Sequence, residues 1–122
     1  MATMIDETVI LRYLLNDNKR QADEAAATIA SGTTLVYPEI IARTAVSLRD
    51  VYHVPRSVIG EALTRLLEDV TVVDEAAVRL AIRYFSSTLL DFTDCLMVAR
   101  NVLCGHRVVS FDKAILKKML PV

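Results

Sequence analysis

Short runs of β-branched and apolar residues alternate along this chain with longer segments of helical periodicity, and this alternation constrains the fold most. The short runs predict strands at residues 3–6, 34–37, 70–73 and 107–110. Alternation of this kind predicts a parallel sheet with helices on both of its faces. We therefore expect an α/β fold, arranged as three layers α/β/α, with a central parallel sheet of four to five strands.

Proline and glycine mark the expected helix ends. Pro38 and Pro55 stand at the first turns of two predicted helices, where the missing N–H of proline does no harm. Gly32 and Gly105 follow the last helical residues of two others. The predicted helices cover residues 9–15, 21–30, 38–52, 55–67, 75–85, 90–105 and 113–119. We find no repeat or linker, so residues 1–122 are predicted to form a single domain.

Composition narrows the class of protein. Apolar residues make up 53% of the chain, charged residues 24%, and the net charge is −1, which is typical of a globular protein and unlike a dedicated duplex-DNA binder. No segment reaches the roughly 18 apolar residues of a membrane span, and the N-terminus lacks the basic start of a signal peptide. Cys95 and Cys104 show no metal-binding spacing and would point to opposite sides of one helix. We expect both to be buried free thiols, in a cytoplasmic protein without membrane contact.

Four aspartates fall at the ends of predicted elements. Asp6 ends the first strand, Asp112 follows the fourth, and Asp91 and Asp94 open the helix before it. In open α/β sheets, ligands bind beyond the carboxyl ends of the strands, so we expect these carboxylates to meet at one edge. Crowded carboxylates repel one another, and a divalent cation removes that cost. This pattern predicts metal-assisted attack of water on a phosphodiester.

Each acid also has a structural interpretation. Asp91 is a candidate N-cap, with Asp94 in the first turn of the same helix, where the helix dipole favours a negative charge. Asp112 is a candidate N-cap of the last helix, and Asp6 a candidate turn residue. For each aspartate, a structural role and a role in a metal site both stay open. The placement of all four acids at the ends of elements favours the metal site.

The chain resembles a PIN domain, and in particular the toxin ribonuclease of VapB–VapC-type toxin–antitoxin pairs. The resemblance rests on four motifs in order: IDETVILRYLLND, PEIIARTAVSLRDVYHVPR, LDFTDCLMVARNVLCG and VVSFDKAI. It implies a ribonuclease that cleaves single-stranded RNA with Mg²⁺ or Mn²⁺, forms homodimers and is silenced by a cognate antitoxin. It also implies that Asp6 and Asp94 are the main metal ligands and that Asp112 assists a second metal or the attacking water. Asp91 matches an additional acid of the same family.

The second family acid, a glutamate, is replaced by Arg43, which cannot bind a cation. Arg43 is a candidate partner for Asp6 or Asp94, or for Glu39 one helical turn away. Glu39 is also a candidate substitute acid. The sequence therefore supports two hypotheses: a metal-dependent endoribonuclease, or a catalytically impaired PIN domain that binds antitoxin or RNA. A phosphoryl-transfer domain with Asp6 as nucleophile is a third, but Thr8 stands where such a phosphatase has its second acid.

Overall fold

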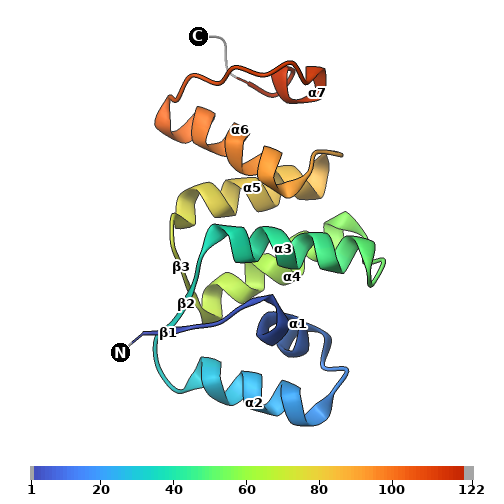
Figure 1. Cartoon of the computed structure of the whole chain (residues 1–122), viewed down its shortest axis with the longest axis vertical. Coiled ribbons are helices and arrows are strands. Elements are labelled where there is room, and N and C mark those ends of the chain that lie inside the picture. Colours follow the sequence, from blue (N-terminus) through green and yellow to red (C-terminus); the bar gives the residue numbers. More distant parts are fainter. Residues whose placement is uncertain (1, 120–122) are drawn as a thin grey trace.

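A computed structural model describes residues 2–119. Figure 1 shows the helices stacked along the longest axis, with α2 at one end, α7 at the other and the short strands at one side of the stack. In chain order the described elements are β1 (Thr3–Met4), α1 (Glu7–Leu15), α2 (Lys19–Ala30), β2 (Thr34–Val36), α3 (Pro38–Asp50), α4 (Arg56–Asp69), β3 (Thr71–Val72), α5 (Glu75–Ser87), α6 (Phe92–Cys104) and α7 (Lys113–Leu116).

The sheet is parallel, as the alternation of strands and helices predicts. Its strand order is β1-β2-β3, with Thr3 opposite Thr34 and Leu35 opposite Thr71. Within residues 2–119 the sheet has three strands, fewer than the four to five expected. The α/β class is therefore confirmed, in a form that is mostly helical with a small sheet.

The expected fourth strand is wrong. Residues 107–110 leave the end of α6 as irregular chain and run past it toward α7 (Figure 1). Val108 and Val109 have high strand propensity, but such propensity reflects packing on a neighbouring strand more than an intrinsic backbone preference. No strand edge lies beside them in the described chain, so the local preference is not realised.

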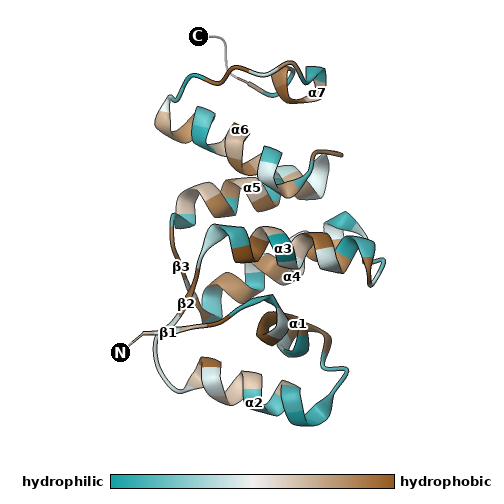
Figure 2. Ribbon diagram, in the orientation of Figure 1, coloured by the Kyte–Doolittle hydropathy of each residue, from teal (hydrophilic) through white to brown (hydrophobic). Residues whose placement is uncertain are grey.

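The core lies between the middle helices, where hydrophobic residues are concentrated (Figure 2). The rings of Phe85 on α5 and Phe92 on α6 are fully buried, with centroids 5.6 Å apart. The predicted stripe on α4 supplies Ile59 and Leu63 to this core, whereas Val58 is 47% exposed. α4 and α5 approach closely at Gly60, where an added Cβ would lie 1.8 Å from the Oγ of Ser86. Helix packing therefore carries most of the buried surface.

The end of α6 follows the sequence prediction. Gly105 adopts the left-handed conformation, φ 68°, and its N–H donates to the Asn101 carbonyl, which ends the helix. Both cysteines of this helix are free thiols, and Cys95 is buried, as expected. The expected burial of Cys104 is wrong, because this residue is exposed at the last turn of α6. No helix among residues 2–119 is long and apolar enough to cross a bilayer.

Candidate acidic site

Asp6 caps the N-terminus of α1. Its Oδ1 accepts hydrogen bonds from the backbone N–H groups of Thr8 (2.9 Å) and Val9 (3.3 Å) and from the Thr8 hydroxyl. The Thr8 hydroxyl is the largest cause of a lowered pKa for Asp6. Within the described chain its Oδ2 accepts no hydrogen bond. Asp6 is therefore an ionised helix N-cap with one free oxygen, a structural role different from the turn residue expected as its alternative.

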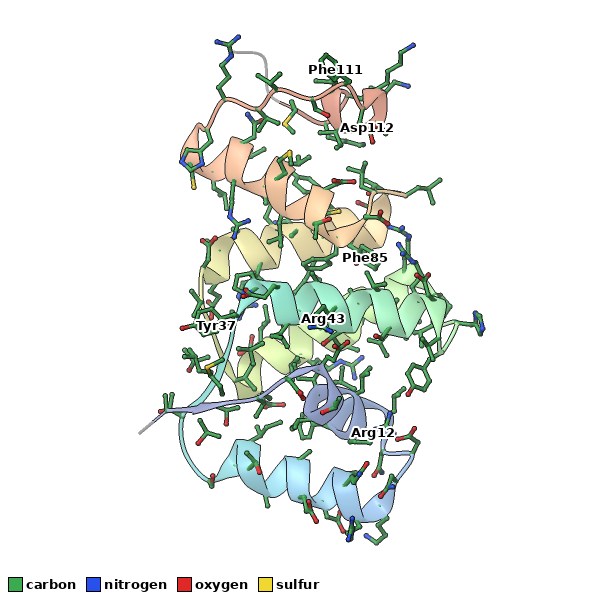
Figure 3. The ribbon with its side chains drawn as sticks, in the orientation of Figure 1. Arg12, Tyr37, Arg43, Phe85, Phe111 and Asp112 are labelled. Atoms are coloured by element: carbon green, nitrogen blue, oxygen red, sulfur yellow. The ribbon has the colours of Figure 1, made fainter. Side chains whose placement is uncertain are left out.

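Arg43 pairs with Glu7 across the contact between α3 and α1. Its Nε lies 2.9 Å from the Oε1 of Glu7, and the Oε2 of Glu7 accepts a hydrogen bond from Ser47 Oγ at 3.3 Å. Figure 3 shows Arg43 on the side of α3 that faces α1. The positive charge of Arg43 contributes to the lowered pKa of Asp6. Within the described residues Arg43 thus pairs with the half-buried Glu7, and the expected ion pairs with Asp6, Asp94 or Glu39 are not formed.

Asp91 lies directly before α6, and Asp94 lies in the first turn of this helix. Asp91 occupies the N-cap position, yet its side chain makes no capping bond and instead accepts from Arg49 Nη1 at 3.0 Å. Asp94 is half-buried and has no hydrogen bond or ion pair within residues 2–119. Burial raises the pKa of Asp94, and the negative charges of Asp91 and Asp112 raise it further. Asp94 is thus a crowded carboxylate without a cation.

Asp112 caps the short helix α7. Its Oδ1 accepts from the N–H groups of Ala114 (2.8 Å) and Ile115 (3.4 Å), which confirms the structural interpretation of this residue. Its charge nevertheless reaches Asp94 and raises the pKa of that carboxyl group. Asp112 therefore has a capping role and an electrostatic effect on the start of α6.

The four aspartates form two groups within one copy. Asp91, Asp94 and Asp112 interact electrostatically, whereas Asp6 lies with Glu7 and Arg43. Along the longest axis, α3, α5 and α6 separate α1 from α7 (Figure 1). Among residues 2–119, no three His, Cys, Asp or Glu side chains, the exposed Glu39 included, are placed to hold a metal ion together. The expected meeting of all four acids at one sheet edge does not occur within one chain.

Two arginines that sequence analysis did not single out position the start of α6. Arg56 donates from Nη1 to the carbonyls of Phe85 (3.2 Å), Thr88 (2.9 Å) and Leu90 (2.8 Å), and lies over the Phe85 ring at 4.3 Å. Arg49 bridges Asp50 (2.7 Å) and Asp91 (3.0 Å). Nothing in the sequence marks these longer contacts, because the carbonyls that Arg56 binds and the Asp91 that Arg49 binds lie 29 to 42 residues away along the chain.

A cavity of about 530 Å³ lies between α1, α2 and the chain after α3, and two of its lining residues, Thr8 and Val9, donate hydrogen bonds to Asp6. Arg12 borders it, donating from Nη2 to the Tyr52 hydroxyl at 2.8 Å and lying 3.3 Å from Asp17. The charge of Arg12 is paired with Asp17, whereas its buried Nε donates no hydrogen bond within residues 2–119. The other lining residues are Leu11, Gln21, Glu24, Ala25 and Thr28.

Comparison with known proteins gives no relative. No protein-family model matches the chain, and no curated protein or solved structure matches it. The chemistry of this chain therefore has to be inferred from its own residues.

Proposed function

We propose that this chain is a metal-dependent endoribonuclease of the PIN type that cleaves single-stranded RNA with Mg²⁺ or Mn²⁺. The crowded carboxylate of Asp94 carries the proposal. Burial and the charges of Asp91 and Asp112 disfavour its ionised form, and no protein cation within the described chain compensates it. Hard divalent cations bind carboxylates in such a setting. The PIN-like three-layer arrangement is part of this proposal.

The proposed ligands have free oxygen atoms. Asp94 makes no hydrogen bond, and the Oδ2 of Asp6 accepts none within residues 2–119. One copy does not gather three such groups, so at most two of these side chains meet at one point in the described chain. The site of a single copy is therefore partial, and we expect weak metal affinity.

Arg43 weakens the site further. A guanidinium stands where a ligand is expected, and its charge already stabilises the ionised form of Asp6. Glu7 partly offsets this charge through the 2.9 Å ion pair. We expect Asp6 to bind a cation less well than it would beside a carboxylate.

A second candidate function is a PIN domain that binds RNA or an antitoxin without cutting. The Arg43–Glu7 ion pair beside Asp6 favours it, because the guanidinium of Arg43 stands at the position where an acidic metal ligand is expected. We further propose a cytoplasmic homodimer that binds a cognate antitoxin. The strongly exposed Leu89 and Phe111, at 90% and 99%, are apolar surface that a partner would cover.

Incubation with single-stranded RNA and Mn²⁺ tests the first proposal. We expect slow cleavage by the wild-type chain, loss of cleavage in Asp94→Asn, and no change in Asp23→Asn, whose carboxylate pairs with Lys19 on the exposed face of α2. Arg43→Glu should cleave faster. The absence of cleavage by both the wild type and Arg43→Glu would leave the non-catalytic binding module.

A further inference from the structure

Residues 107–111 have the composition of a strand and no strand partner. Within the described chain no backbone–backbone hydrogen bond involves these residues. Val109 is 78% exposed and Phe111 is 99% exposed, at the outer end of the molecule (Figure 3). An irregular segment with unpaired N–H and C=O groups and large exposed apolar side chains is a candidate partner for a sheet edge.

β1 offers such an edge. The N–H groups of Thr3 and Ile5 donate to the carbonyls of Thr33 and Leu35 on the β2 side. Because successive residues of a strand alternate, the N–H and C=O of Met4 point to the opposite side of β1. β1 is the terminal strand of the described sheet, and Met4 is 67% exposed.

The edge and the segment do not meet within one copy. Figure 1 places β1 beside α1 and α4, and the segment after α6 at the far end of the stack. A second copy can supply the segment while α5 and α6 of each copy stay packed through Phe85 and Phe92.

We propose that residues 107–111 of one copy add as a parallel strand to β1 of a second copy, and that the exchange is reciprocal. Each copy carries one donor segment and one acceptor edge, so a two-fold axis satisfies both. Parallel addition continues the direction of the β1-β2-β3 sheet. The exchange pairs the free backbone groups of the donor segment with those of β1, and it covers the side chains of Val109 and Phe111.

The exchange would also join the two groups of acids. With Phe111 beside Ile5, Asp112 of one copy lies next to Asp6 of the other, because each aspartate directly follows the paired residue in the chain. The acids that lie apart in one copy then form a composite site across the interface. This consequence rests on the proposed ribonuclease function, whereas the strand exchange itself does not.

Cysteine pairing tests the exchange directly. In a Cys104→Ser background, which removes the exposed native thiol, Met4→Cys and Ser110→Cys chains are mixed and oxidised. We expect a covalent dimer from the mixture. A mixture of Val58→Cys, on the exposed face of α4, with Ser110→Cys should give none. A doubly substituted chain that closes on itself as a monomer, or a mixture that gives no covalent dimer, would overturn the proposal.

A backbone change gives an independent test. Val109→Pro removes one N–H of the donor segment in a residue that is exposed and unpaired in the single copy. By light scattering after size exclusion we expect the wild type to be dimeric, Val109→Pro monomeric at the same concentration, and Val58→Asn, on the exposed face of α4, dimeric. A wild type that is monomeric at all concentrations, or a Val109→Pro chain that stays dimeric, would count against the exchange.

Complementation separates this inference from the proposed function. Asp6→Asn and Asp112→Asn keep a helix-capping side chain, so both variants should fold. Mixed after unfolding and refolding together, they should regain about a quarter of wild-type cleavage, since half the dimers are mixed and each has one intact composite site. Wild-type cleavage with an inactive mixture would overturn the composite site alone. A covalent dimer without cleavage by the wild type would overturn the ribonuclease and leave the exchange standing.

Discussion

Arg43 and Glu7 form an ion pair, with Nε 2.9 Å from Oε1, at the point where α3 crosses the start of α1. The pair stands next to Asp6, whose pKa is lowered by the Thr8 hydroxyl and, to a smaller extent, by the charge of Arg43. The positive charge at this position therefore belongs to the environment of a proposed metal ligand. Replacing it should change cation binding.

Arg43→Glu should strengthen Mn²⁺ binding. It removes a positive charge beside Asp6 and adds a carboxylate, and we expect a gain of about tenfold in affinity, or ~1.4 kcal/mol. The increase in Tm on adding Mn²⁺ measures this gain. Arg43→Gln, which removes the charge and adds no carboxylate, should give a smaller gain. Equal Mn²⁺-induced shifts in all three proteins would show that Arg43 lies outside any metal site.

Asp94→Asn should stabilise the metal-free protein near neutral pH. The folded state raises the pKa of Asp94, so the stability linked to its protonated form is lost as pH rises through the folded pKa. Asparagine removes that loss, by less than about 1 kcal/mol because the carboxylate is partly exposed. The gain in Tm should shrink as pH falls below the folded pKa. A destabilised Asp94→Asn at pH 7 would mean that the carboxylate is compensated.

Gly60→Ala should destabilise the contact between α4 and α5. The new Cβ would lie 1.8 Å from the Oγ of Ser86, and overpacking of this kind costs about 1–3 kcal/mol. Urea unfolding should show a lower midpoint. Gly32→Ala, where nothing lies within 4 Å, is the matched control. An unchanged midpoint for Gly60→Ala would show that the two helices are not this close.

Arg56→Lys should destabilise the turn that leads into α6. The guanidinium donates to four carbonyls, those of Phe85, Thr88, Leu89 and Leu90, and an ammonium on a flexible stem cannot match this fork. We expect a loss of about 2 kcal/mol in the free energy of unfolding. Arg65→Lys, on an exposed face of α4, should cost little. If both variants unfold alike, Arg56 does not hold the turn.

The parts of the fold that depend on local chemistry were predictable from the sequence. Pro38 begins α3, Gly105 ends α6 in the left-handed conformation, and the apolar stripe of α4 supplies the buried Ile59 and Leu63. Residues 107–110 were predicted as a strand because their β-branched composition favours one. A strand also needs a neighbouring edge, and an edge is a long-range property that composition does not contain.

The candidate site was predictable in its residue types and less so in its geometry. Asp6 and Asp112 lie at helix N-termini, which the sequence allowed for Asp112. The Arg43–Glu7 pair and the interaction of Asp94 with Asp112 depend on how distant helices cross. The predicted site requires residues 107–110 to pair as a strand of the sheet, which would bring Asp112 to the same edge as Asp6. These residues form no strand in the described chain, so Asp6 stays apart from the other acids.

Calorimetric titration of Mn²⁺ into the wild-type chain, Asp94→Asn and the exposed control Asp23→Asn tests the central claim most directly. We predict a measurable binding isotherm for the wild type and for Asp23→Asn, and an affinity at least about tenfold lower for Asp94→Asn, because a carboxylate ligand is lost. Equal binding by all three proteins, or no heat of binding in the wild type, would contradict a metal site built on Asp94.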